Sequence, residues 1–260
     1  MHPREMPDEP TLRRALDDAG LGDVVEDVLA TRRNGLRLVL TRAEVDVGVS
    51  KIGGRPDLAS GVAWPVDAEG NPLIFLAQFD LAKVHRVLEG ASPLPESGLL
   101  SFFFGTEQDE IALDGDDQSR CVIYSEGMFE RLGPPENSLA SLIECAVETV
   151  TVSLLPDFDS VHLDTVFDDA QRDRYIDALE PFEQGNHGSD DHRFLGHPGF
   201  IQGDPRYEAS DDWVFLFQID SEDAKHGMMW GDAGQVYFYV HRESIRDRSF
   251  SRVIAYMDCS

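Results

Sequence analysis

The fold is decided by two related stretches of sequence, "PLIFLAQFDL" at residues 72–81 and "WVFLFQIDSE" at residues 213–222. Both contain the pattern Phe-Leu-x-Gln-x-Asp. Side chains alternate between the two faces of an extended strand, and in each stretch both faces are largely apolar. Each stretch is therefore predicted to form a central strand that is covered on both sides.

Other short matches recur in the same order in the two halves of the chain. "GRP" at residues 54–56 is matched by "GHP" at residues 196–198, and Gly98 before "LLSFFF" is matched by Gly234 before "QVYFYV". Chance supplies one short match far more readily than an ordered series, and repeats tolerate small differences in loop length. The sequence therefore predicts an internal duplication whose two halves are related by a pseudo-two-fold axis.

The pattern of expected elements gives the fold class. Strands outnumber helices and do not alternate regularly with them, which is typical of an α+β fold with a mostly antiparallel sheet. We expect a helical segment over residues 1–35 and a single domain over 36–260, built from two similar lobes at about 36–130 and 148–257. Strands are predicted at 36–41, 45–49, 73–79, 99–104, 121–125, 148–155, 213–219, 235–240 and 252–257, helices at 11–33, 81–89, 138–145, 168–180 and 242–247, and mostly loop at 181–212.

The composition is strongly acidic. The 260 residues include 49 Asp and Glu against 22 Lys and Arg, for a formal net charge of −27. Such a surface repels a phosphate backbone, which argues against direct nucleic-acid binding. Two explanations stay open: a solubility or salt-tolerance surface, which the even spread of the acids favours, and an acidic face for a basic protein partner.

No part of the sequence indicates export or insertion into a membrane. The N-terminus "MHPREMPDEP" lacks the apolar segment of a secretory signal, and no apolar run approaches the roughly 20 residues of a membrane helix. Cys121, Cys145 and Cys259 are far apart, which argues against a disulfide framework or a zinc cluster. We therefore expect a cytoplasmic protein with reduced thiols.

Several segments carry a resemblance to a known family. "SKIGGRPDLASGVAWPVDAEGNPLIFLAQFDL", "LPESGLLSFFF", "HRFLGHPGFIQGD" and "MMWGDAGQVYFYV" occur in an order that resembles the YwqG-like bacterial family, a domain of unknown function. The resemblance covers about residues 36–257. It implies a compact cytoplasmic α+β protein, and it carries no catalytic residues over to this chain.

The repeated pattern supplies the first candidate site residues. Gln78 and Asp80 share one face of their strand, and so do Gln218 and Asp220. One interpretation is structural: each glutamine ties a loop to the sheet, and each aspartate caps the segment that follows. The other interpretation is that the two Gln/Asp pairs line one ligand cleft between the lobes.

Loop residues complete the tentative ligand-binding set. Trp64 and Trp230 could stack on a sugar or a base-like ring, or could instead plug the core beneath their loops. Asp232 is a turn residue beside Trp230, and His197 and Gln202 lie in the long loop. His187, His192 and His197 recur every five residues, which matches no zinc pattern, so neither a metal nor another cofactor is predicted.

No catalytic motif is recognisable, and catalytic residues remain unassigned. The sequence favours a non-enzymatic binding or interaction protein whose acidic surface neutralises a basic partner, for example a toxin. The alternative is a small-molecule-binding protein or a hydrolase with its site between the lobes, in which carboxylates and histidine would act as general acids and bases. The sequence does not predict an oligomeric state.

Overall fold

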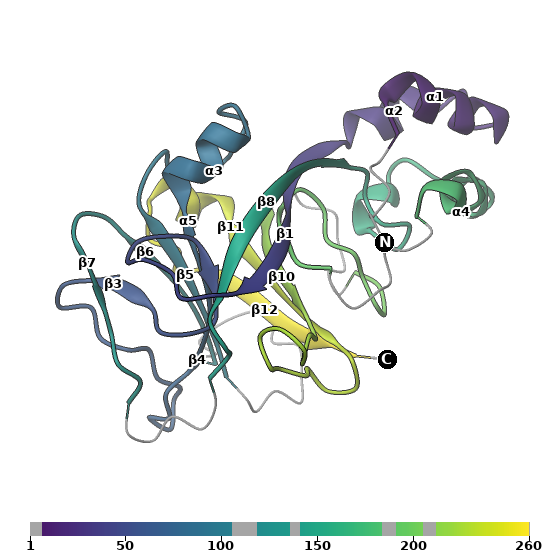
Figure 1. The fold of residues 1–260 in the computed structure, drawn as a ribbon. Coiled ribbons are helices and arrows are strands. Elements are labelled where there is room, and N and C mark those ends of the chain that lie inside the picture. Colours follow the sequence, from purple (N-terminus) through teal and green to yellow (C-terminus); the bar gives the residue numbers. More distant parts are fainter. Residues whose placement is uncertain (1–6, 106–118, 136–140, 184–190, 205–211, 260) are drawn as a thin grey trace.

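The two repeated stretches form strands β4 (Ile74–Asp80) and β10 (Trp213–Asp220), as predicted. The computed structural model describes residues 7–105, 119–135, 141–183, 191–204 and 212–259 (Figure 1). The remaining strands are β1 (Arg33–Arg42), β2 (Lys51–Ile52), β3 (Asp57–Ala59), β5 (Leu99–Phe104), β6 (Arg120–Ser125), β7 (Phe129–Arg131), β8 (Cys145–Leu154), β9 (Arg193–Leu195), β11 (Gln235–His241) and β12 (Val253–Asp258). The helices are α1 (Glu9–Asp18), α2 (Val25–Ala30), α3 (Leu81–Val87), α4 (Asp169–Glu183) and α5 (Arg242–Arg246), with a 3-10 turn η1 (Val161–Leu163).

Ten strands form one antiparallel sheet in the order β12-β11-β10-β9-β1-β8-β2-β4-β5-β6, and β3 pairs with β7 separately. The long pair β1–β8 stands at the centre, with its register running from Arg33 opposite Leu154 to Arg42 opposite Cys145. The edge strands β6 and β12 contact each other, and Arg120 Nε donates a hydrogen bond of 2.9 Å to the Val253 carbonyl. The sheet therefore curls until its two edges meet, close to a barrel.

The space inside the curled sheet is filled by aromatic side chains from both halves of the chain. Phe79 stacks on Phe194 with ring centroids 4.1 Å apart, and Phe102 lies 5.0 Å from Phe217 and 5.2 Å from Phe238. All five rings are fully buried. The halves therefore share one sheet and one core, because the strands of both halves bury their apolar faces against each other. Two similar lobes with a ligand site between them remain a prediction.

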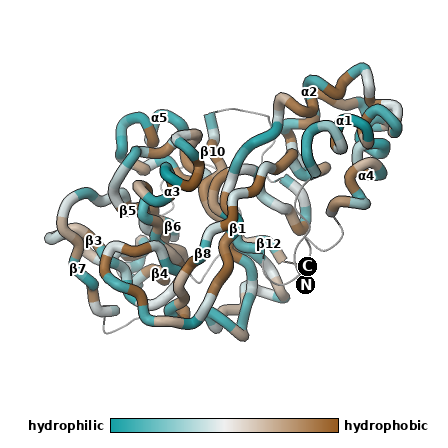
Figure 2. The backbone as a smooth tube through the Cα atoms, turned by 45° about the horizontal axis from the view of Figure 1, so that its top comes forward, coloured by the Kyte–Doolittle hydropathy of each residue, from teal (hydrophilic) through white to brown (hydrophobic). Residues whose placement is uncertain are grey.

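A smaller helical part, made of α1, α2 and α4, lies beside the start of β1 and the end of β8 (Figure 1). Leu12 and Leu16 of α1 pack with Val28 of α2 against Tyr175 and Leu179 of α4 in a separate hydrophobic core. The predicted N-terminal helical segment thus gains its packing partner from the later residues 155–182. Figure 2 shows hydrophobic stretches along the strands and hydrophilic outer turns.

Two local predictions are wrong. Residues 45–49 form no strand, and Val47 and Val49 are 50% and 40% exposed. Cys145 begins β8 instead of ending a helix, because it pairs with Arg42 on one side and Ile52 on the other. The rest of that predicted helix is coil at residues 141–144, and residues 136–140 lie outside the described part of the chain. No helix in the described part is long and apolar enough to cross a membrane.

Candidate functional site

Gln78 is fully buried and ties the loop around β2 to β4. Its Oε1 accepts a hydrogen bond of 2.9 Å from the Asp57 backbone N–H. Its Nε2 donates to the Val49 carbonyl at 2.9 Å and to Asp57 Oδ2 at 2.7 Å. Every polar atom of the amide is therefore bonded to the loop that precedes the strand.

Gln218 makes the same arrangement in the second half. It is fully buried, its Oε1 accepts from the Gly199 N–H at 2.9 Å, and its Nε2 donates to the Asp191 carbonyl at 2.9 Å. Lys51 is the strand partner of Gln78, and Arg193 is the strand partner of Gln218. In both halves the amide thus joins the backbone two residues before and six residues after its strand partner. The two glutamines are separate ties, and they do not face one cleft.

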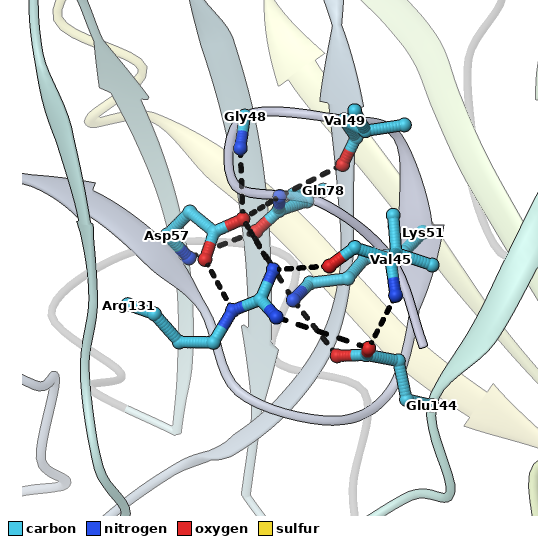
Figure 3. A network of polar contacts seen from close by, with 8 residues as sticks. All are labelled: Val45, Gly48, Val49, Lys51, Asp57, Gln78, Arg131 and Glu144. Atoms are coloured by element: carbon cyan, nitrogen blue, oxygen red, sulfur yellow. Dashed lines mark hydrogen bonds and ion pairs between the residues drawn. The ribbon is translucent and has the colours of Figure 1, made fainter. Parts of the chain in front are cut away.

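A buried network of charges surrounds Gln78 (Figure 3). Lys51 and Asp57 are fully buried; Lys51 Nζ lies 3.0 Å from Glu144 Oε2, and Arg131 Nε lies 2.8 Å from Asp57 Oδ1. Burial by itself raises the pKa of the Asp57 carboxyl, but Arg131 and Gln78 outweigh it and hold that pKa below its ordinary value. Burial lowers the pKa of Lys51, and Glu144 offsets part of this effect. The network joins β2, β3 and β7 to the residue that precedes β8, so it supports the fold.

The two aspartates of the repeated pattern also bond to nearby backbone. Asp80 is the N-cap of α3 and accepts hydrogen bonds from the N–H groups of Ala82 and Lys83, at 3.0 and 3.4 Å. Asp220, which is 5% exposed, accepts from the N–H groups of Asp191 and Ser221 at 3.1 and 2.8 Å. Asp80 therefore caps the helix that follows it, as the structural interpretation predicted, whereas Asp220 also holds the backbone of Asp191, 29 positions earlier in the sequence.

The other predicted site residues lie in both halves of the sheet. Trp64 donates its indole N–H to the Leu73 carbonyl at 2.8 Å, and Trp230, which is 5% exposed, packs inside the curled sheet. Gln202 is exposed near the end of β12, where its N–H donates to Asp258 at 2.9 Å. Asp232 is exposed in the turn before β11. Gln202 and the turn that holds Trp230 and Asp232 both lie against Cys259. Trp230 also donates its backbone N–H to Ser221 Oγ at 2.8 Å, next to Asp220, whereas Trp64 packs against Phe103 in the other half of the sheet.

A buried histidine cluster joins His192 to Glu222 and His226, and the sequence prediction missed the last two. His192 Nδ1 accepts a hydrogen bond of 3.0 Å from the Asp220 N–H, so the ring proton is on Nε2, which lies 3.0 Å from Glu222 Oε2. His226 Nε2 donates to the Asp220 carbonyl at 2.9 Å. Burial, with His192 close by, lowers the pKa of His226 to about 4.

This cluster has the residue types of a metal site, but the protons on its histidine rings are not placed as metal binding requires. A metal-bound imidazole needs a lone pair on one nitrogen and an N–H on the other. The backbone N–H that faces Nδ1 of His192 prevents that nitrogen from carrying a proton. The arrangement therefore fits a hydrogen-bonded support for the loop between β10 and β11. His187 lies outside the described residues.

A cavity in the described part of the chain lies where the helical part meets the sheet. Its volume is about 390 Å³. Segments that are far apart in sequence line it: the start of β1, the loop after α3, η1, the turn after β9, and the adjacent ends of β10, β11 and α5. Of the nine predicted site residues, His197 is the one that lines it.

The lining of this cavity is cationic, polar and aromatic. Its charged or titratable side chains are Arg33, Arg242, His162 and His197, and its aromatic side chains are Trp213, Phe215 and Tyr239. His197 Nε2 donates to the Thr31 carbonyl at 2.7 Å, which fixes the ring 6.1 Å from that of His162. No Asp or Glu is among the described lining residues. We call this site the arginine-histidine cavity.

The comparison with protein families identifies the family of the chain. Residues 50–259 match the model of DUF1963, a domain of unknown function. The chain belongs to this family. The DUF1963 match begins just before β2, so it includes most of the arginine-histidine cavity but excludes Arg33 and Asn34 on β1. No curated protein matches the chain.

The sequence held few signals for the residues that do converge. The spacing Glu222-x-x-x-His226, directly after the second repeated stretch, was a signal for the buried histidine cluster. Arg33, His162 and Arg242 belong to no motif. They line one cavity only because the start of β1, η1 and the start of α5 lie around it.

Proposed function

We propose that this DUF1963 protein binds a small molecule in the arginine-histidine cavity. The observation that carries the proposal is the cavity itself, whose volume of about 390 Å³ falls in the range of ligand sites, roughly 300–1,000 Å³. Its walls combine aromatic side chains with a few polar groups, the composition that ligand sites in proteins share.

A library of cationic, neutral and anionic small molecules, screened by thermal shift, tests the proposal. Binding stabilises the folded state by mass action, so a ligand of this cavity raises Tm. Ala91→Trp places an indole at the cavity wall and should abolish the shift, whereas Ala43→Trp, at an exposed position outside the wall, should preserve it. A library without any hit, or hits that Ala91→Trp leaves unchanged, would contradict the proposal.

A second candidate function is binding of a basic protein partner, for example a toxin. It is supported by the excess of 49 acidic over 22 basic residues, which attracts cations over long distances. Pull-down from native lysate at low and high salt tests it. We expect a stoichiometric basic partner that is released at high salt, and recovery of no such partner would count against this function.

We further propose that the two halves of the sheet arose by duplication. The strand order supports this, since β2-β4-β5-β6 leads outward from β8 as β9-β10-β11-β12 leads outward from β1. Register shifts occur in β4 between Phe75 and Ala77 and in β10 between Phe215 and Phe217. A repeat offset near 140 residues should recur in other family members, and its absence from most of them would contradict duplication.

From the resemblance in the sequence we also propose that the protein is YwqG-like, bacterial and cytoplasmic. Cell fractionation with an antibody against the native protein tests the location. Recovery in an extracellular or membrane fraction would contradict it.

A further inference from the structure

We infer that the ligand of the arginine-histidine cavity is a small organic anion, with a carboxylate or phosphate group attached to a flat apolar body. This inference rests on the proposed function and specifies its ligand. It is carried by the charge of the cavity, by the geometry of its donors and by its aromatic wall.

The charge of the lining is the opposite of the charge of the protein. At the average of the whole chain, about three of the 15 lining residues would be acidic, and the described lining has none. Two arginines stand there instead, Arg33 at the start of β1 and Arg242 at the start of α5. The described lining therefore contributes positive charge in a molecule with a net charge of −27.

The donors suit a planar anion. A guanidinium presents two parallel N–H groups that match the oxygens of a carboxylate or phosphate. Asn34 and Ser92 add neutral donors from two other segments of the wall. Because these groups come from β1, α5 and the loop after α3, an anion held between them would connect separate parts of the chain.

The remaining wall is aromatic and firmly held. Trp213 and Phe215 supply the rings that a ligand can reach, and the fully buried Tyr239 packs edge-on against Phe215 with ring centroids 5.6 Å apart. Trp213 packs edge-on against His241 at 5.2 Å, and Arg252 Cζ lies 5.8 Å from the centre of its ring. Fixed aromatic surfaces favour flat apolar groups, which can stack or pack edge-on against them.

Isothermal titration with three matched compounds tests the inference. Phenylacetate and phenyl phosphate carry the two anionic groups, and phenylacetamide is the neutral counterpart of phenylacetate. We expect one or both anions to bind and the amide to bind at least about tenfold more weakly. Preference between the two anions identifies carboxylate or phosphate as the natural group.

Arginine variants assign the anion to the cavity. Arg242→Gln should weaken binding of the preferred anion about tenfold or more, and Arg242→Lys, which keeps the charge but loses the paired donors, should be intermediate. Arg246→Gln removes the same charge from the exposed end of α5, outside the cavity, and should leave binding unchanged. Equal urea midpoints for the variants show that they are folded.

Each outcome separates the two proposals. Equal binding of phenylacetamide and phenylacetate, equal effects of Arg242→Gln and Arg246→Gln, or no binding of either anion at millimolar concentration would overturn the anionic ligand. In those cases a neutral or cationic library hit that Ala91→Trp blocks would still support small-molecule binding. Absence of any such hit would overturn the proposed function as well.

Discussion

Replacing the repeated glutamines tests the account of the fold most directly. Gln218→Met keeps the approximate length of the buried side chain but removes the hydrogen bonds to the Gly199 N–H and the Asp191 carbonyl, both 2.9 Å long. Each backbone group that loses its partner inside the protein costs about 1–3 kcal/mol. We therefore expect Gln218→Met to lower the free energy of unfolding by about 2–6 kcal/mol.

Gln78→Met should cost more than Gln218→Met. It removes the two equivalent bonds and a third one, 2.7 Å long, to the carboxylate of Asp57. A hydrogen bond to a charged group contributes about 1.5–3 kcal/mol, so the two variants should differ by roughly that amount. Because domains of this kind are stable by only about 5–15 kcal/mol, Gln78→Met could leave little folded protein at 37 °C.

Urea unfolding, followed by circular dichroism and tryptophan fluorescence, measures both effects. Gln202→Met is the matched control, because that exposed amide bonds to the Cys259 carbonyl, which water can solvate instead, and its loss should stay below about 1 kcal/mol. Losses below about 1 kcal/mol at both buried positions would refute the view that the glutamines tie the loops to the sheet.

Three further predictions concern charge, pH and backbone contact. Lys51→Met should lower the free energy of unfolding by about 3 kcal/mol, because it breaks a buried ion pair. This is the lower end of the usual range for such pairs, since Glu144 is partly exposed. A loss under about 1 kcal/mol in urea unfolding would contradict this. Because the pKa of His226 is about 4 when folded and 6.5 when unfolded, the unfolded state binds the extra proton, so stability should fall as the pH drops from about 7 to 4. His226→Gln should remove up to about 3 kcal/mol of that fall, so the urea midpoint of the variant should change less with pH than that of the original protein. An equal dependence of the midpoint on pH would contradict the lowered pKa of His226. Gly35→Ala should disrupt the β1–β9 pair, because its Cβ would lie 2.4 Å from the Leu195 carbonyl oxygen; an unchanged Tm would count against this close approach.

Much of the fold could be predicted from local patterns. The apolar runs of β4, β5, β10 and β11 are buried over nearly their whole length, and such runs predict central strands. The two- and three-residue strands β2 and β9 could not be found this way, because they are too short to show a period. Their positions are supported by the buried amides of Gln78 and Gln218, which lie on the neighbouring strands β4 and β10.

The candidate site was almost entirely beyond prediction. Asp80 caps the helix that follows it, as local sequence suggested, but Asp220 also bonds to the distant Asp191 N–H. His197 reached the cavity without any pattern that distinguished it from His192. Arg33 and Arg242 are more than 200 positions apart in the sequence and belong to no motif. Their meeting depends on where strands and helices end, which no local pattern specifies.

The sequence by itself determined the long apolar strands, the ordered pattern that the two halves of the chain share, and the strongly acidic composition, because periodicity and charge are local properties. Tertiary structure alone decided that the halves share one curled sheet, and that the repeated glutamines are separate ties. It also decided that a cavity whose described lining holds two arginines opens beside the helical part. These features depend on contacts between residues that are distant in sequence, where the burial of apolar faces and of hydrogen-bonding groups is settled by the whole chain together.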